Sequence, residues 1–405
     1  MSESESKQEQ PKEEGKILSL LPWLKLQVPI KVKEVVFTPY SIQSGDPEHI
    51  FHSYKKEIDR LLSSYRDIRG KIINECALAY TDKKDPCSSA VDIRLVSNAL
   101  HMLTFAALAR NKFCVQFGSY TNSSYFETVF QKFSKGSEFI RIMTRRRDGY
   151  FHLTGHKHGE VKFSMPLECA ERAASVFDDA LLVSLGYVLE EKEPLSRRLM
   201  QSIWLYNLAC SDSHSIPIER QIVIMVSAFE QLFAGCQGAN DLACKVDTLL
   251  DNYGSVIVDN CSRISDIQLT SGRENSERQW FIHRKWIQEL YQLRNNYTHG
   301  DDSGRRSWGW NNLEHSLMAA FVFPLIVKIL LAQQSQYSLV EANYVRMGAI
   351  DKLLSAQNWF ERDPATGVSV WQKVISDHKL NSSIERAIEK VINKQESSSS
   401  GRSQQ

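Results

Sequence analysis

The residues best suited to chemistry gather in the stretch LYQLRNNYTHGDD, which runs from Leu290 to Asp302. Arg294 is permanently charged and presents a planar fork of donors, so it suits a phosphate but cannot act as a base. His299 titrates near neutral pH, so it can take the proton from a ribose 2′-hydroxyl or give one to a leaving oxygen. An arginine and a histidine placed together can therefore cleave RNA without a metal ion.

The interval between the two residues does not by itself identify a site. Three other pairs in the chain have a similar interval: Arg94 with His101, Arg147 with His152, and Arg278 with His283. What distinguishes Arg294 and His299 is their context. Asn295 follows the arginine, Gly300 follows the histidine, and the pair ends a long helical pattern. The setting is therefore more informative than the spacing.

Helices must position this pair. Apolar residues recur at helical spacing from about Arg278 to the stop at Gly300, namely Ile282, Trp286, Leu290, Leu293 and Tyr297. Three more helices are predicted upstream, in LSRRLMQSIWLYNLAC, IPIERQIVIMVSAFEQLFAGC and NDLACKVDTLLDNYG, and an apolar helix follows from Asn312. The C-terminal half therefore predicts an all-α helical bundle.

In this setting LRNNYTHG resembles the signature of HEPN domains, in particular the Apea-like HEPN group. That signature has an arginine followed by a polar residue, four to six residues before a histidine. The upstream helix IVIMVSAFEQLF resembles the second helix of the group, which ends in an apolar–Glu pattern, here Phe229 and Glu230. The resemblance covers about Ser196 to Gln336, roughly a third of the chain.

The resemblance implies a dimeric, metal-independent endoribonuclease, in which two motifs face each other across a two-fold axis and 2′-hydroxyl attack leaves a cyclic phosphate. His299 is then the general acid or base and Arg294 binds the scissile phosphate. Asn295 orients that phosphate or holds the arginine. Glu230 is either a support for Arg294 or an ordinary solvated residue with a local ion pair. Similar proteins are toxins or antiviral defence effectors, so the implied partners are RNA, a second copy of the chain, and a regulator or trigger recognised by the N-terminal half.

Two other interpretations of the motif stay open. The family includes members that have lost catalysis, so the alternative function is a non-catalytic HEPN module for dimerisation or for binding RNA or protein. Alternatively, Arg294 and His299 merely complement the dipole of a helix C-terminus, where Gly300 supplies a left-handed cap. This last interpretation leaves the two adjacent asparagines, Asn295 and Asn296, unexplained.

Residues beyond the motif offer further candidate contacts with RNA. Arg305 and Arg306 follow His299 closely and can guide a polyanion, while Trp308 and Trp310 can stack on bases. The competing interpretation makes the arginines solvated charges and uses at least one tryptophan to pack the loop against the bundle.

A metal site has weaker support. His152, His156 and His158 in FHLTGHKHG can approach one another at a predicted hairpin. No fourth ligand accompanies them, and a solvated turn is the simpler interpretation. We therefore expect neither a metal nor another cofactor.

Composition divides the chain into five segments. Residues 1–16 and 395–405 are polar and predict disordered tails. Residues 17–190 mix strand-like and helical patterns, which predicts an α+β domain. Residues 195–338 are the HEPN-like bundle, and 339–394 predict a C-terminal helical extension.

The remaining features predict a cytoplasmic protein. The formal net charge is +1, which excludes a strongly basic coat for nucleic acid, and the eight cysteines contain no CxxC pair. The N-terminus lacks the apolar run of a signal peptide. The most apolar window, Ser316 to Ala332, is slightly short for a membrane span and contains Pro324 and Lys328. We expect it to be a buried helix of the bundle.

Overall fold

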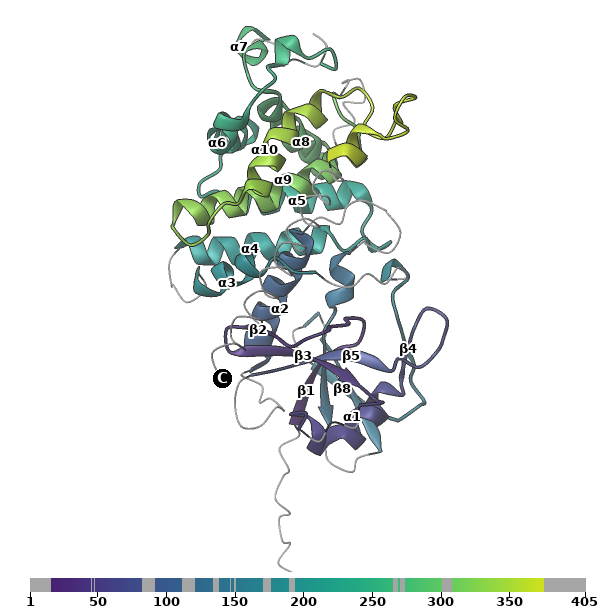
Figure 1. The fold of residues 1–405 in the computed structure, drawn as a ribbon. Helices are drawn as coiled ribbons and strands as arrows, with labels where there is room; N and C mark the ends of the chain where they lie inside the picture. Colours follow the sequence, from purple (N-terminus) through teal and green to yellow (C-terminus); the bar gives the residue numbers. More distant parts are fainter. Residues whose placement is uncertain are drawn as a thin grey trace, which may run out of the picture. The chain divides into compact units, whose positions relative to one another are not determined.

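A computed structural model shows a sheet-containing region followed by a mainly helical one (Figure 1). It describes residues 16–44, 46, 48–81, 92–110, 121–133, 138–145, 147–148, 151–169, 176–188, 194–264, 269, 274–300 and 308–374. Contacts divide the chain into two compact units. Unit 1 comprises Met1–Leu103 and Ser123–Ser175, and unit 2 comprises Thr104–Asn122 and Val176–Gln405. This division differs from the expected boundary near residue 190, because part of the N-terminal half belongs to unit 2.

Unit 1 contains a seven-stranded sheet in the order β2-β3-β5-β1-β6-β7-β8. Every pairing between neighbouring strands is antiparallel. The strands are β1 (Lys16–Leu21), β2 (Ile30–Val32), β3 (Val35–Ser41), β5 (Glu75–Thr81), β6 (Val129–Phe133), β7 (Phe139–Arg145) and β8 (Phe151–Lys157). The antiparallel pairing agrees with the α+β class predicted for this half.

Shorter elements complete unit 1. The first helical turn η1 (His52–Tyr54) leads into α1 (Lys55–Leu62), which buries Ile58, Leu61 and Leu62. Strands β4 (Tyr65–Arg66) and β9 (Phe163–Ser164) form a separate parallel pair. Two more 3-10 turns are η2 (Ser123–Phe126) and η3 (Leu167–Cys169).

The local sequence signals in unit 1 were only partly correct. The alternating stretch LKLQVPIKVKEVVF predicts a strand that Pro29 either places at an edge or breaks in two. In the structure β2 begins after Pro29 and pairs with β3 across a tight turn at Lys33, whose φ is 56°.

The glycines after Arg147 predict turns at Asp148–Gly149 and near Gly155 and Gly159. The turn near Gly155 is absent, because Gly155 lies within β8 opposite Arg141. The turn at Gly159, with φ of 87°, is present. The stretch KFCVQFGSY, whose pattern predicts a strand, lies outside the described residues.

Unit 2 is built mainly from helices. The long helix α2 (Asp92–Leu108) begins in unit 1 and ends in unit 2. Eight more follow: α3 (Asp179–Val188), α4 (Pro194–Ala209), α5 (Ile218–Leu232), α6 (Ala239–Leu250), α7 (Glu274–Arg278), α8 (Ile282–His299), α9 (Asn312–Gln333) and α10 (Glu341–Ser355). Short turns η4 (Asp251–Tyr253) and η5 (Val258–Asn260) lie between α6 and α7. The tails expected at 1–16 and 395–405 fall outside the described residues, except that Lys16 begins β1. Of the helical extension expected at 339–394, residues 339–374 are described, and they contain α10.

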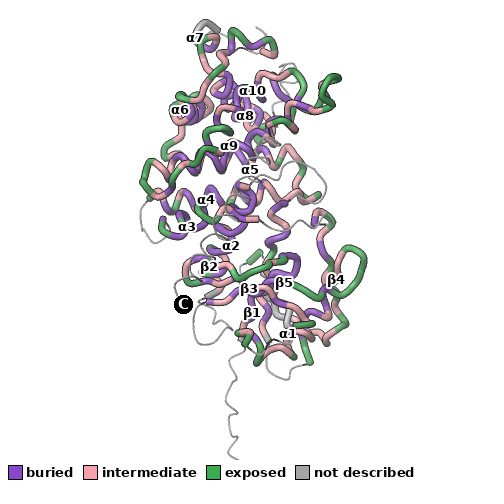
Figure 2. The backbone as a smooth tube through the Cα atoms, in the orientation of Figure 1, coloured by how far each residue is buried: buried purple, intermediate pink, exposed green. Residues whose placement is uncertain are grey.

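The core of unit 2 is organised around the ring of Phe323 on α9. It stacks on Tyr206 of α4 at 4.8 Å and meets the edges of Phe229 of α5 at 5.1 Å and Phe105 of α2 at 6.0 Å. All four residues are fully buried, and Figure 2 shows α9 as a mostly buried helix among the others. One side chain therefore joins four helices that are distant in sequence.

Helix α9 is also the single helix among the described residues that is long and apolar enough to cross a membrane. In its most apolar window 78% of the residues are buried within the protein, which agrees with the buried bundle helix that we expected. Its one basic residue in this stretch, Lys328, pairs with Asp178 at 2.7 Å. Burial lowers the pKa of Lys328 to about 8, although the charge of Asp178 opposes this shift.

We predict that Phe323→Ala destabilises unit 2 by about 3 to 5 kcal/mol, because it removes a buried ring and leaves a cavity between four helices. The matched control is Phe360→Ala, since that ring is 43% exposed and its loss should cost less than about 1 kcal/mol. Urea unfolding followed by circular dichroism measures both changes. Equal destabilisation by the two variants would contradict the central role of Phe323.

Candidate functional site

The expected helix end is present at Gly300. Helix α8 runs to His299, and Gly300 adopts the left-handed conformation, with φ of 68° and ψ of 20°. Its backbone N–H donates to the carbonyl of Asn296 at 3.0 Å. A residue with a Cβ atom is strained in this conformation, which explains why glycine stands here. The capping role of Gly300 is therefore compatible with a site at the same helix end.

Arg294 is held in place by two neighbours. One terminal nitrogen donates to Asn295 Oδ1 at 2.9 Å, and the other donates to Glu230 Oε2, also at 2.9 Å. The side chains of Arg294 and Glu230 are 22% and 23% exposed. The guanidinium has five N–H donors, so these two bonds leave three for another ligand. The arrangement fixes the arginine while part of it still faces solvent.

Tyr291 belongs to the same cluster, although the sequence did not indicate it. The Arg294 guanidinium lies over the Tyr291 ring, 5.1 Å from its centroid. Burial, together with a hydrogen bond to Glu230 and the charge of that carboxylate, raises the pKa of Tyr291 to about 12. The phenol therefore stays protonated at neutral pH. The sequence held one signal that could have identified Tyr291: it stands one helical turn before Asn295, on the same face of α8.

His299 is placed differently from the other motif residues. It is exposed at the last position of α8, and its imidazole forms no hydrogen bond or ion pair within the part of the chain that the structure describes. It stands four residues after Asn295 and five after Arg294, so it shares a helix face with Asn295 more closely than with the arginine. Asn295 therefore bonds to the Arg294 guanidinium and shares a helix face with His299.

A second set of bonds secures the end of α8. Tyr297 donates its hydroxyl hydrogen to Asn312 Oδ1 at 2.8 Å, and Asn312 in turn donates to Glu219 Oε1 at 3.5 Å. Asn312 begins α9 and Glu219 lies in the first turn of α5. The helix end that carries His299 is therefore attached to both neighbouring helices.

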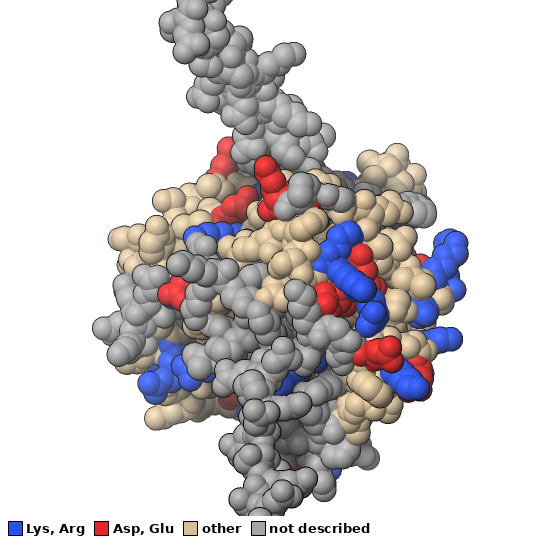
Figure 3. All heavy atoms as spheres, turned by 90° about the horizontal axis from the view of Figure 1, so that it is seen from below, with Lys and Arg blue, Asp and Glu red and all other residues tan. Residues whose placement is uncertain are grey.

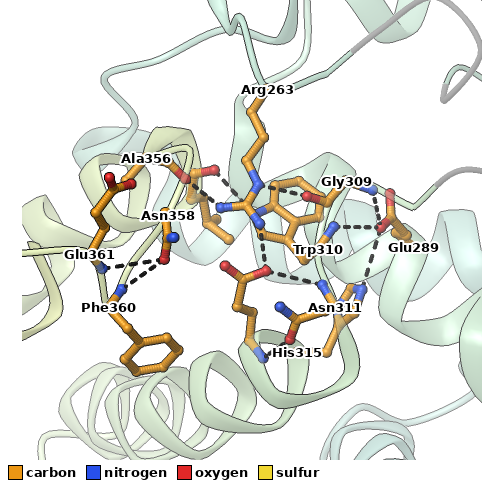
Figure 4. A network of polar contacts seen from close by, with 12 residues as sticks. Arg263, Glu289, Gly309, Trp310, Asn311, His315, Ala356, Asn358, Phe360 and Glu361 are labelled. Carbon is orange, nitrogen blue, oxygen red and sulfur yellow. Dashed lines mark hydrogen bonds and ion pairs between the residues drawn. The ribbon is translucent and has the colours of Figure 1, made fainter.

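The segment after the motif is anchored at its far end (Figure 4). Glu289 of α8 accepts the backbone N–H of Gly309 at 2.7 Å and that of Trp310 at 3.3 Å. Arg263 donates to the Gly309 carbonyl at 2.6 Å and also pairs with Glu314. These contacts hold Gly309 and Trp310 in place just before α9 begins.

The candidate RNA contacts beyond the motif have different outcomes. Arg305 and Arg306 lie outside the described residues. Trp310 is 2% exposed and donates its ring N–H to the carbonyl of Leu354 at 3.1 Å. It therefore packs the loop against the bundle, as expected for at least one tryptophan, whereas Trp308 is partly exposed.

Arg278 and His283 have the same interval as Arg294 and His299, but they make contacts that stabilise the fold. Arg278 pairs with Asp259 at 2.8 Å. His283 is buried, with Nδ1 2.9 Å from Asp351 and Nε2 3.1 Å from Asp247. Burial lowers the pKa of His283, but the two carboxylates outweigh it and the net shift is upward. Arg278 and His283 thus join separate local networks.

Two of the three histidines considered as metal ligands lie within a strand and not at a hairpin tip. His152 and His156 belong to β8 and His158 follows it. Within the described residues, no group of three or more metal-binding side chains comes together. On the face drawn in Figure 3, basic and acidic groups are interspersed, in keeping with a net charge of +1.

No protein-family model, curated protein or solved structure matches the chain. The likeness to HEPN domains therefore rests on the motif residues and on the helices that place them.

We predict that Gly300→Ala destabilises unit 2 by about 1 to 2 kcal/mol, because alanine must adopt a left-handed conformation. Gly348→Ala is the matched control. Gly348 lies within α10, and a Cβ atom there would meet nothing within 4 Å, so alanine should stabilise by about 0.5 to 1 kcal/mol. Thermal and urea unfolding measure both. The same sign of change in the two variants would show that Gly300 does not cap α8.

Proposed function

We propose that unit 2 is a metal-independent endoribonuclease of HEPN type. The observation that carries the proposal is the arrangement at the end of α8. Arg294 is held by Glu230 and Asn295 with part of its surface open. Five residues later His299 is exposed, and no described residue bonds to its imidazole. A helix cap needs a cation and a glycine, but it does not need the arginine to be fixed by two neighbours.

The proposed reaction needs charge stabilisation and proton transfer. The ribose 2′-oxygen attacks the phosphorus, the bond to the 5′-oxygen breaks, and the products are a 2′,3′-cyclic phosphate and a free 5′-hydroxyl. Arg294 uses its remaining donors on the phosphate oxygens, where charge accumulates in the transition state. His299 removes the 2′-hydroxyl proton or supplies one to the 5′-oxygen.

The other members of the cluster hold the arginine in position. Glu230 accepts from Arg294 and from Tyr291, so it prevents the guanidinium from turning toward solvent. Asn295 occupies one edge of the same group. In this proposal the three residues fix the phosphate-binding fork and take no part in proton transfer.

The proposed site is completed by a second copy of the chain. One histidine cannot easily be base and acid in the same step, whereas two related by a two-fold axis can divide the roles. Each copy has its His299 exposed at a helix end, where a partner can approach. We further propose that the protein is cytoplasmic and acts as a toxin or defence effector, with a trigger or inhibitor recognised by unit 1. The alternative function, a non-catalytic module for dimerisation or for RNA or protein binding, gives the opposite result in the first test.

We predict that the purified protein cleaves mixed cellular RNA in EDTA and leaves cyclic phosphate ends. His299→Ala and Arg294→Ala should each lower the cleavage rate by about 10²-fold or more, because they remove proton transfer and charge stabilisation. Arg294→Lys should restore little, since lysine lacks the planar fork. Gel analysis and end-group mapping measure the outcome.

Two exposed residues of unit 2 serve as controls. His214→Ala removes an imidazole from the loop between α4 and α5, and Lys352→Ala removes a cation from α10. Both should cleave like the wild type. If the wild type is inactive under these conditions while still binding RNA, the non-catalytic function replaces the nuclease; if all variants cleave equally, the site lies elsewhere.

A mixing experiment tests the composite site. When wild type exchanges subunits with a threefold excess of His299→Ala, about one quarter of wild-type chains remain paired with wild type. Activity per wild-type chain should fall to about that level, because mixed dimers lack one histidine. RNA is kept in excess over protein, so competition for substrate does not contribute. Unchanged activity per wild-type chain would show that each copy works alone.

A further inference from the structure

Unit 2 contains a cavity of about 470 Å³ on a different part of the bundle from the Arg294 cluster. The ends of α2 and α4, the first half of α5 and the first half of α9 form its walls, through residues such as Leu108, Cys210, Met225 and Leu317. Its volume lies within the range typical of small-molecule sites. Apolar side chains supply much of this lining, so the cavity can bury an apolar ligand.

A C-terminal hairpin closes one side of this cavity. Trp371 donates its backbone N–H to the carbonyl of Trp359 at 3.1 Å, and the two rings stack at 5.6 Å with an angle of 6°. Trp359 is fully buried and anchors the hairpin. Phe360 and Trp371 both line the cavity, while Phe360 is 43% exposed. The cavity therefore offers an aromatic wall with one accessible ring.

The charges of the lining select among aromatic ligands. Arg362 is the one cation and Asp212 the one carboxylate among the described lining residues. The Arg362 guanidinium is exposed, and nothing in the described part of the chain forms a hydrogen bond or ion pair with it. A single planar fork matches a single carboxylate, whereas a doubly charged phosphate calls for more positive charge.

The polar groups opposite the fork favour a hydrogen-bond donor on the ligand. Asp212 supplies carboxylate oxygens. Gln221 donates its side-chain N–H to the carbonyl of Ile216 at 3.0 Å, which leaves its Oε1 as an acceptor. Both groups suit a ring N–H. Cys210 also lines the cavity, but burial raises the pKa of its thiol, so it is not a ready nucleophile.

We propose that this cavity is a binding site for a small aromatic monocarboxylate that carries a ring N–H donor. The ring lies against Phe360 and Trp371, the carboxylate pairs with Arg362, and the ring N–H faces Asp212 and Gln221. This site is separate from the proposed nuclease and does not depend on it.

Isothermal titration calorimetry with indole-3-acetate tests the proposal, with indole as the analogue that lacks the carboxylate. Wild type should bind one indole-3-acetate per chain, about tenfold more tightly than indole, because of the charge-assisted bond to Arg362. Arg362→Gln should remove that tenfold difference and leave indole binding unchanged, which isolates the arginine–carboxylate pair. Phe360→Ala should weaken both ligands.

Three further variants make the result decisive. Ser316→Trp places a ring in the cavity from α9 and should abolish binding of both ligands, with thermal unfolding to verify the fold. Lys352→Gln removes a cation away from the cavity and should change nothing. Arg294→Ala should also leave binding unchanged, so failure of the nuclease and failure of this site remain distinguishable.

Several outcomes would overturn the proposal. No binding of indole-3-acetate, an equal preference for indole, or full binding by Ser316→Trp would exclude the site as described. Loss of binding in Arg294→Ala would move the ligand to the other cluster. Adenosine monophosphate bound more tightly than indole-3-acetate would show that the charge argument selects the wrong class of anion.

Discussion

The packing of three aromatic rings around Phe323 is the constraint on which unit 2 depends. Its neighbours come from α2, α4 and α5, while Phe323 itself lies near the middle of α9. Large rings that stack on Phe323 or meet it edge to face leave little freedom for the helices to slide or rotate. The contact with Phe229 matters beyond stability, because the next residue is Glu230. The interior of the bundle thus fixes the carboxylate that holds Arg294.

Helix α8 connects the interior of the bundle to its surface. Its first turns are buried among charged and polar partners, including Lys285 and Glu277, which pair at 2.7 Å, whereas its last turn faces solvent. Buried ion pairs add little net stability but require a defined geometry. Because both ends of α8 are bonded to other helices, its final residues occupy a fixed place without being covered.

The sequence predicted most of what depends on local pattern. The periodicity of α8, its stop at Gly300, and the helices α4, α5, α6 and α9 are all found, since amphipathic spacing and a left-handed cap are encoded within one segment. Features that depend on distant partners were missed. Strand β1 forms because β5 and β6 pair with it, the role of Tyr291 depends on Glu230, and the hairpin between Trp359 and Trp371 follows from ring stacking. The Arg294–Glu230 contact joins residues 64 apart in the chain; the resemblance to HEPN domains offered it as one of two alternatives, and periodicity did not indicate it.

The division of α2 between the two units has a consequence for the order of events during synthesis. The final turns of α2, with Phe105, belong to unit 2, yet they leave the ribosome before the last strands of unit 1 and well before α4 or α9. The ring of Phe105 therefore lacks its packing partners until Tyr206 and then Phe323 have been synthesised. Unit 2 cannot assemble as one continuous stretch, because its core is complete only when α9 has been synthesised. For a chain whose proposed activity would harm its own cell, this order of synthesis leaves the packing of Phe229, next to Glu230, incomplete until Phe323 has been made.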